Sequence, residues 1–425
     1  MRTADAIRRW ASTTSVIMPK RCQAPFPGKG AWHLFGIIAF MDPTVRLLRQ
    51  LVAIDSVNPA LVPGAAGEAA IARVLADELR SIGLSVEFQE PAPGRPNVVG
   101  VLEGRQAGRS LMYCGHIDTV GVVGMARPFD PDERNGRIYG RGSQDMKSGV
   151  AAMIGAARVV AESGGLDAGQ LIIACVADEE HASIGAEALV TRWQADAAVI
   201  TEPTNLAVAV CHKGFEWVEV ETEGRAAHGS RPREGRDAIV RMGRVLAALE
   251  ALDDALQTGA SHPLLGTASL HASLIEGGRE LSSYPDRCVL QLERRTLPGE
   301  TAGVAGREVV AILDKLRAGD AEFRATSRLM FSRGAYELPA SHPLPQRLLE
   351  CHASAQSGSS PAPEAVPVVG MSFWTDAAIL GGAGIPTVLY GPTGAGLHGL
   401  EEWVDIASTL TCRDALVNLA RAWCR

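Results

Sequence analysis

The sequence predicts an α/β fold with a mostly parallel central sheet, interrupted by a smaller inserted domain of the ferredoxin-like α+β class. Two stretches of the 425-residue chain alternate helical and strand periodicity, as layered α/β proteins do. The stretch between them instead follows the order strand, helix, strand, strand, helix, strand. One α/β domain split by one insertion explains this order with the fewest assumptions.

The first part of the α/β domain is expected over residues 41–212. It opens with a helix, because Asp42 and Pro43 are residue types that start helices and the apolar residues after them fall at helical spacing. Further helices are expected at 68–82 and at 149–162, where small residues allow close packing. Short apolar runs predict strands at 85–88, 97–102, 110–114, 171–177 and 197–200.

The inserted domain is expected over residues 213–331, and the α/β pattern returns over residues 332–425 with a late strand in TVLYGP. Within the insertion, the predicted strands are 215–223, 268–275, 287–293 and 322–330, and the predicted helices are 236–252 and 308–316. Residues 1–40 are basic, contain one acidic residue and lack sustained periodicity. We interpret them as a disordered extension or an over-long start, with a transit peptide as the alternative.

Composition excludes several classes of protein. The net charge of −7 and the lack of a basic stripe with interleaved aromatic residues argue against nucleic-acid binding. No apolar run is long enough to span a bilayer, so we expect no membrane partner. The eight cysteines form no CxxC pair, and four of them lie in strand-like runs, which is typical of buried thiols in a reducing compartment. The sequence therefore predicts a cytoplasmic globular protein.

The stretch LIIACVADEE ends an apolar strand on Asp178, Glu179 and Glu180. Adjacent carboxylates repel one another and are costly to bury unpaired. Taken alone, such a run would cap a helix or lie on a solvated surface. Other polar residues in the chain, however, occupy comparable positions.

Five residues of metal-binding type fall at strand ends or in nearby loops: His116, Asp145, Glu180, Glu202 and His398. Ligands of α/β sheets bind beyond the carboxyl ends of strands, and nitrogen and oxygen donors suit zinc and related metals. Each residue alone also fits a structural role, but five together predict a metal site. Asp118 shares a strand face with His116 and is suited to orient that histidine.

The motifs GHIDTV, GRGSQDMKSG, DEE, TEPT, AAHGSRP and GLHGLEE occur in this order. Together they resemble the M20 family of zinc peptidases and amidohydrolases, which includes acetylornithine deacetylase, succinyl-diaminopimelate desuccinylase and carboxypeptidase G. The resemblance covers about residues 41–425. It implies a catalytic zinc-hydrolase domain in two parts, a lid domain that forms a homodimer, and two divalent metal ions. Zinc is expected, with cobalt or manganese as alternatives.

The resemblance also implies how the metals are held. Asp145 would bridge the two ions. His116 and Glu202 would complete one coordination sphere, and Glu180 and His398 would complete the other. A carboxylate bridge suits two ions that together bind a water molecule and a carbonyl oxygen.

The remaining roles follow from the same resemblance. Glu179 would be the general base and Asp118 would orient the neighbouring histidine. His228, from the inserted domain, would stabilise the oxyanion, often in the active site of the partner subunit. The family has a cis peptide bond after its bridging aspartate, which predicts one between Asp145 and Met146.

Four positions bear on the substrate. Arg295 is the candidate to bind a substrate carboxylate, and a salt bridge within the lid is its alternative role. Ser282 stands where the family usually has Asn at a polar substrate or dimer contact, and Leu397 replaces the common alanine before the last motif's histidine. Glu202 is typical of the deacylase branches, whereas the peptidase branches tend to have Asp.

These features predict a metal-dependent hydrolase that removes the acyl group from an N-acyl amino acid, similar to acetylornithine deacetylase. The alternative is a dipeptidase or carboxypeptidase of the same family, acting on a dipeptide. A serine hydrolase is disfavoured because no GxSxG motif occurs, and a nucleotide-binding module because no phosphate-binding motif follows an early strand. A binding protein that has lost catalysis would not need Glu179.

Overall fold

The computed structural model describes residues 41–356 and 366–425, so the interpretation of residues 1–40 lies outside the described residues. The helices are α2 Pro43–Val52, α3 Ala69–Ser81, α4 Ser148–Glu162, α5 Ile184–Val190, α6 Ala238–Thr258, α7 Val304–Gly319, α8 Pro343–Ala355, α9 Ala377–Gly382 and α10 Ile406–Trp423, with a short turn η1 at Ser143–Lys147. The strands of the first half are β1 Ser85–Ala92, β2 Arg95–Glu103, β3 Ser110–His116, β4 Asp132–Arg134, β5 Arg137–Tyr139, β6 Gln170–Val176, β7 Ala198–Ile200 and β8 Val208–His212. The later strands are β9 Gly214–Glu223, β10 Ser261–His262, β11 Gly266–Thr267, β12 Ser269–Gly277, β13 Arg287–Thr296, β14 Arg324–Arg333, β15 Tyr336–Glu337, β16 Val368–Met371, β17 Thr387–Leu389, β18 Gly394–Ala395 and β19 Trp403–Asp405.

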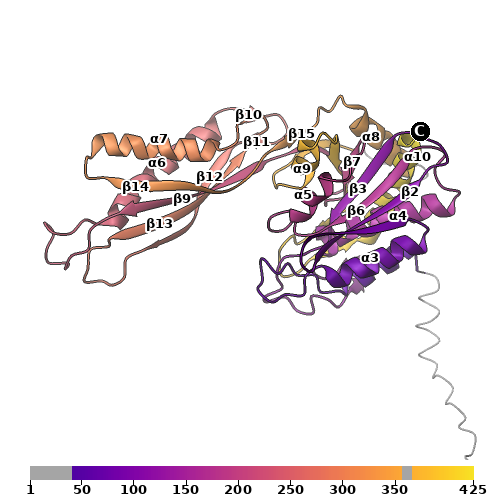
Figure 1. The fold of residues 1–425 in the computed structure, drawn as a ribbon, viewed down its shortest axis with the longest axis horizontal. Coiled ribbons are helices and arrows are strands. Elements are labelled where there is room, and N and C mark those ends of the chain that lie inside the picture. The colour runs from indigo at the N-terminus through magenta and orange to yellow at the C-terminus, as the bar shows by residue number, and fades with distance from the viewer. Residues whose placement is uncertain (1–40, 357–365) are drawn as a thin grey trace, which may run out of the picture. The chain divides into compact units, whose positions relative to one another are not determined.

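A nine-stranded mixed sheet organises the α/β part of the chain (Figure 1). Its order is β1-β2-β6-β3-β7-β17-β8-β15, and β16 pairs with β8. The expected parallel pairing holds in the centre, from β6 to β17, whereas β1, β2 and β15 pair antiparallel. The β1–β2 pair is antiparallel because Pro93 and Gly94, with φ 75°, turn the chain back at once.

Helices cover both faces of this sheet. In β2, Gly100 faces α3, where an added Cβ would lie 3.1 Å from Leu79. Asn97, three residues earlier and therefore on the opposite face, donates a hydrogen bond to the carbonyl oxygen of Gly185 in α5. On the α3 face, Arg158 of α4 forms an ion pair with Glu78. The result is a three-layered arrangement, which agrees with the α/β class that the sequence predicts.

The register of the central strands sets the position of the site. Strands β3, β6 and β7 are parallel, with His116 opposite Val176 and Cys114 opposite Ile200. The chain leaves β6 and β7 directly after these partners, and therefore reaches Glu179 and Glu202 at the same edge of the sheet. The carboxyl ends of three parallel strands thus meet at one place.

A second, small sheet joins two loops that are far apart in the sequence. Its strand order is β18-β19-β5-β4, and all its pairs are antiparallel. Strand β5 leads into the turn that carries Asp145, and β18 and β19 flank the loop that carries His398. The sequence analysis did not predict this sheet, because strands of two or three residues are too short to show periodicity.

The inserted unit, residues 214–333, is a four-stranded antiparallel sheet in the order β12-β13-β9-β14 with helices α6 and α7 (Figure 1). Its element order is the βαββαβ pattern expected from the sequence. A separate apolar core lies between its sheet and helices, formed by residues such as Val218, Leu292, Val309 and Phe323. The boundaries 41–212, 213–331 and 332–425 stay predictions.

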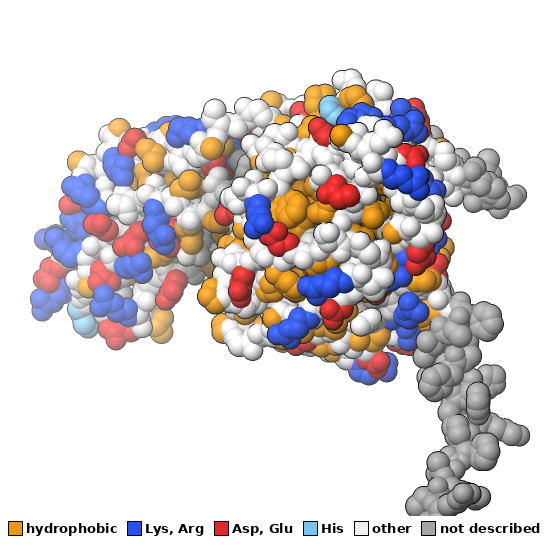
Figure 2. All heavy atoms as spheres, turned by 45° about the vertical axis from the view of Figure 1, so that its right-hand side comes forward, with side chains coloured by type: hydrophobic (Ala, Val, Ile, Leu, Met, Phe, Trp, Pro, Cys, Tyr) orange, Lys and Arg blue, Asp and Glu red, His pale blue; other side chains and the backbone are white. Residues whose placement is uncertain are grey.

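Surface and thiol properties are as the composition indicates. On the face drawn in Figure 2, basic and acidic side chains are interspersed and do not gather into a basic stripe. None of the helices in the described ranges combines the length and apolarity that crossing a bilayer requires. The seven cysteines of the described residues are free and buried.

The start of α4 packs directly on the strand end that carries Glu202, and a glycine makes this contact possible. A Cβ on Gly149 would overlap the carbonyl oxygen of Thr201. Because backbone must move, we expect Gly149→Ala to cost about 1–3 kcal/mol and to lower the melting temperature by several degrees. The matched control is Gly306→Ala in α7, where nothing lies within 4 Å of the new Cβ. That variant should keep or slightly raise the melting temperature, and equal behaviour of the two variants would contradict the packing argument.

Candidate metal centre and active site

Asp145 lies between two groups of potential ligands. Its Oδ1 atom is 3.0 Å from His116 Nε2, and its Oδ2 atom is 3.4 Å from His398 Nε2. Glu202 completes the first group, with Oε1 3.7 Å from His116 Nε2. Glu180 completes the second, with Oε2 3.1 Å from His398 Nε2. All five residues expected to bind metal therefore lie close together, and their assignment to two separate ions stays a prediction.

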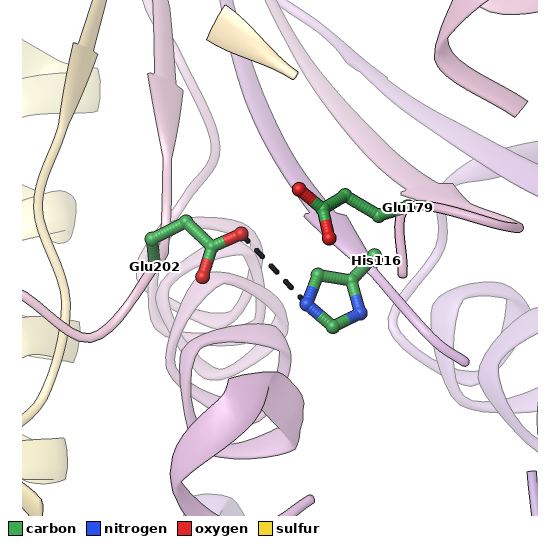
Figure 3. A group of neighbouring side chains, drawn as sticks. All are labelled: His116, Glu179 and Glu202. Atoms are coloured by element: carbon green, nitrogen blue, oxygen red, sulfur yellow. Dashed lines mark ion pairs between the residues drawn. The ribbon is translucent and has the colours of Figure 1, made fainter. Parts of the chain in front are cut away.

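Figure 3 shows His116 together with Glu202 of the first group and with Glu179, the predicted general base. Glu202 and Glu179 extend from the ends of two strands toward the imidazole of His116. One potential ligand atom from each of these three residues lies within 4.8 Å of the others, and the same holds for His116, Asp145 and Glu180. The peptide bond between Asp145 and Met146 is cis, as expected.

The electrostatics of the site fit divalent cations. Burial raises the pKa of Glu179 and of Glu202 well above the ordinary carboxyl value, and the charges of neighbouring carboxylates add to the effect. Burial also raises the pKa of Glu180, whose Oε1 atom is buried without a hydrogen-bond partner. Desolvated carboxylates with open lone pairs are the donor set that a divalent metal neutralises.

The acidic residues of the site raise the pKa of both histidines. Hydrogen bonds to Asp145 and Glu180 raise the pKa of His398 to about 10. Burial alone would lower the pKa of His116, but the contact with Asp145 and the charge of Glu202 raise it well above its usual value. The same histidines and carboxylates can therefore serve either as ion pairs or as metal ligands.

Asp118 supports both His116 and the acidic run. His116 Nδ1 is 3.1 Å from the backbone oxygen of Asp118 and 3.7 Å from its Oδ1 atom. The carboxylate of Asp118 also accepts hydrogen bonds from the backbone N–H groups of Glu179 and Glu180, at 3.1 and 3.2 Å. This aspartate therefore fixes the positions of the two glutamates as well as facing the histidine.

Asp178 is held away from the metal-binding cluster. Its φ of 71° turns the chain after β6, and its Oδ1 atom accepts hydrogen bonds from Arg95 at 2.9 Å and from Asn58 at 3.0 Å. Arg95 also makes a bidentate ion pair with buried Glu68. The three adjacent acids therefore separate: Asp178 is paired with an arginine, and the next two point into the site.

Glu402 is a supporting residue that the sequence analysis did not single out, although it lies in the GLHGLEE motif. Its carboxylate accepts hydrogen bonds from the backbone N–H groups of Gly142, Gln144 and Asp145 at 2.8–3.1 Å. Arg141 donates a further bond at 2.7 Å. This fully buried carboxylate fixes the turn that presents Asp145.

Two other polar residues near the site were also missed. Asn58, from SVNP, donates to Asp118 Oδ2 at 2.8 Å as well as to Asp178. Asp376 is buried, and burial raises its pKa to about 7. Neither residue belongs to a metal-ligand pattern in the sequence, so only their position in the fold reveals them.

A cavity of about 480 Å³ opens beside the cluster. Its lining includes Glu179 and the candidate metal ligands Asp145, Glu180, Glu202 and His398, and also Arg295 and Leu397. Arg295 is paired with Glu293, with Nε 2.7 Å from Oε1, and is about one third exposed. It is therefore placed where it can contact a bound molecule, while also making the lid salt bridge that was its alternative role.

His228 and Ser282 do not line this cavity. They are neighbours at one end of the inserted unit, where Ser282 accepts a backbone hydrogen bond from Gly229 at 2.6 Å. His228 is exposed, and its Nδ1 atom is 2.8 Å from Ser230 Oγ. Within one chain, the structure thus leaves these two predicted site residues apart from the others.

A sequence profile described as peptidase family M20/M25/M40 matches residues 112–422. The chain belongs to this family. The resemblance drawn from the ordered motifs is confirmed, and the protein is an M20 hydrolase that acts on amide or peptide bonds.

Relatives of this M20 hydrolase include deacylases. It is 27% identical over 415 residues to an N-formyl-4-amino-5-aminomethyl-2-methylpyrimidine deformylase of Bacillus subtilis, covering 90% of this chain and 95% of the relative. It is 32% identical over 271 residues to an acetylornithine deacetylase of Proteus mirabilis, covering 60% and 68% of the two chains. A Bacillus subtilis structure described as a dinuclear metal-binding M20 peptidase has the same fold, with a TM-score of 0.66 at 14% identity over 93% of this chain and 99% of that one.

Proposed function

We propose that this M20 hydrolase removes the acyl group from an N-acyl amino acid or a closely related small amide. The observation that carries the proposal is the position of Glu179, which lines the cavity together with Asp145, Glu180, Glu202 and His398, four of the five potential metal ligands. Arg295 lines the same cavity and is suited to bind a carboxylate.

The candidate ligands would form two cation-binding sites. His116, Asp145 and Glu202 would hold one divalent cation, and Asp145 with Glu180 and His398 would hold a second. When bound, such cations supply positive charge that polarises an amide carbonyl and acidifies water. Zinc fits the mixed nitrogen and oxygen donors, and cobalt or manganese would fit them too.

Glu179 would move the protons. Its burial raises its pKa, so the carboxylate is a better base than an exposed glutamate and can keep the proton that it takes from the attacking water. It would then return this proton to the leaving amine. Asp118 keeps Glu179 in place through the backbone, because it accepts the N–H of that residue.

Deacylation is favoured over peptide cleavage by two observations. Glu202 is the residue type that the sequence analysis associates with deacylase branches. The acetylornithine deacetylase and the deformylase both have names that describe removal of a small acyl group from an amine, and the deformylase matches over nearly its whole length. Dipeptidase or carboxypeptidase activity remains the second candidate because the solved M20 structure is described as a peptidase.

The first experiment tests both the reaction and the metals. A panel of N-formyl and N-acetyl amino acids and dipeptides is assayed with enzyme stripped by a chelator and then reloaded with zinc, cobalt or manganese. We expect activity to disappear on chelation, to return with metal, and to be higher on the N-acyl compounds than on the dipeptides. Full activity in enzyme shown by elemental analysis to be metal-free would refute the metal chemistry, and a preference for dipeptides would favour the peptidase.

A second experiment separates the base from the ligand. Glu179→Ala should lower kcat by at least about 100-fold while the metal content stays near that of the unaltered enzyme, since general bases contribute on the order of 10²–10⁴. Glu180→Ala should lose metal, because it removes one member of the set around His398. Metal content is measured by elemental analysis. Equal loss in both variants would show that the two roles are confused.

Homodimer formation through the inserted unit is part of the proposal. Among the strands of the described residues, β12 is an edge strand that pairs only with β13, and it exposes Leu274 and Ile275, which are 65% and 55% accessible. An exposed apolar edge is a site for strand pairing across a two-fold axis. A partner subunit would cover this edge and would bring its His228 to the cavity, which lacks that residue within one chain.

Mixing inactive subunits tests this arrangement. In a mixed dimer of Glu179→Ala and His228→Ala subunits, one site has both residues intact if the histidine acts across the interface. Part of the activity should therefore return on mixing and subunit exchange. Mixing Glu179→Ala with Glu180→Ala is the control, since both residues belong to the same site and no intact site forms. Failure of the first mixture to regain activity, with dimers present, would mean that the histidine acts within its own chain.

A further inference from the structure

Four aromatic side chains form one wall of the cavity beside the metal centre: Phe215, Trp217, Phe331 and Trp374. Four pairs of these rings are in contact, with centroids 5.3–6.2 Å apart. Phe215 contacts each of the other three, and Trp217 also contacts Phe331. They come from β9, from β14 and from the segment after β16, so the fold gathers them from three regions of the sequence. We call these four residues the aromatic wall.

The aromatic wall is not part of the core of the inserted unit. In β9, Val218 and Val220 point toward the helices and are fully buried. Phe215 and Trp217 alternate with them and therefore lie on the other face, where the next residue along is Glu219. Trp217 remains 38% exposed. Packing of the core of the inserted unit does not require large aromatic side chains on this face of β9.

A β-bulge completes the wall. The register between β14 and β9 shifts between Leu329 and Phe331, so that Leu329 is opposite Val218 and Phe331 is opposite Trp217. Bulges of this kind re-aim a side chain and often lie next to active sites. Here the bulge places the ring of Phe331 5.5 Å from that of Trp217.

The indole rings are fixed in position by hydrogen bonds at their edges. Trp217 Nε1 donates to Glu293 Oε2 at 2.8 Å, and Trp374 Nε1 donates to the carbonyl oxygen of Gly334 at 3.0 Å. Because the polar edges are already bonded, the apolar faces are what the wall can offer to a ligand. Rigid rings of this kind are suited to stack on a second planar group.

Two arginines beside the aromatic wall affect which charge a ligand can carry there. Arg295 lies over Phe215 at 5.4 Å, and Arg333 lies over Phe331 at 4.8 Å and over Trp374 at 5.6 Å. Arg333 is fixed by Glu187 at 2.8 Å. Since two guanidinium groups already interact with the ring faces, a ligand ammonium would have to compete with them for the same rings. A cationic side chain such as that of ornithine is therefore disfavoured, and a neutral or anionic group is favoured.

We propose that the group beyond the amide in the substrate is a planar aromatic or heteroaromatic ring without positive charge, stacked on the aromatic wall. This inference rests on the proposed amide hydrolysis, because it places the amide at Glu179 and the ring at the wall of the same cavity. The volume of about 480 Å³ leaves room for a ring as well as a small acyl group. An aromatic amino-acid side chain and a pyrimidine share this chemistry.

Binding to an inactive enzyme tests the ring preference without turnover. The Glu179→Gln variant, reloaded with metal, is titrated in a calorimeter with N-acetylphenylalanine, N-acetylleucine, N-acetylornithine and an N-formyl aminomethylpyrimidine. We expect at least one ring compound to bind roughly fivefold or more tightly than N-acetylleucine, and N-acetylornithine to bind most weakly. Which ring compound binds more tightly distinguishes the two sources of the ring. Equal binding of the phenylalanine, pyrimidine and leucine compounds, or tightest binding of the ornithine compound, would overturn the proposal.

Variants of the wall provide the second measurement. Phe331→Leu and Trp374→Leu should each reduce the ratio of ring-compound to leucine-compound affinity by a factor of roughly three or more. The matched control is Phe88→Leu on β1, an exposed phenylalanine with Arg80 5.7 Å from its ring centre, which should keep the ratio unchanged. An unchanged ratio in both wall variants, with normal melting temperatures, would overturn the proposal. If ring compounds bind selectively but no amide is hydrolysed by the unaltered enzyme, the proposed function fails while the ring preference stands.

Discussion

Mutual repulsion among buried carboxylates is the constraint on which the rest of this structure depends. Asp145, Glu179, Glu180 and Glu202 lie close together, and the imidazoles of His116 and His398 are in contact with members of this group. Such a cluster would disperse toward solvent unless the backbone held each member in place. Most of the local architecture can be understood as the means by which it does so. The strand register sets the positions of His116 and Glu202, Asp118 holds the backbone of the two central glutamates, and Glu402 holds the turn of Asp145.

Much of this arrangement could be predicted from the sequence, because it depends on local signals. The helix α4 and the strand β6 were expected to within one residue, since each spans several periods of its pattern. The ligand types at strand ends were also visible, because parallel strands bring their carboxyl ends together. The order of six motifs then indicated the family, which the matched profile confirms.

The remaining features depend on contacts that no local pattern encodes. Asn58 donates hydrogen bonds to Asp118 and Asp178, which are 60 and 120 positions away in the sequence. The residues around Asn58 have the composition of an ordinary loop. The aromatic wall joins positions 215 and 374, which share no motif. At one edge of the large sheet, β1 and β2 are antiparallel because a two-residue turn joins them. At the other edge, β15 has only two residues, so its antiparallel pairing with β8 depends on the rest of the fold. His228 differs again, because no contact within a single chain brings it to the cavity.

The small sheet β18-β19-β5-β4 affects the order in which regions of the protein can fold. Glu402 reaches back 257–261 positions to hold the turn of residues 141–145, and His398 comes from the same late segment. Contacts of such long sequence separation form late, because the intervening chain must be ordered first. During synthesis, the N-terminal portion of the chain emerges from the ribosome well before this segment does. The candidate metal site can therefore be completed only after the segment has docked, so the nascent chain lacks one of the proposed ligands through most of its synthesis.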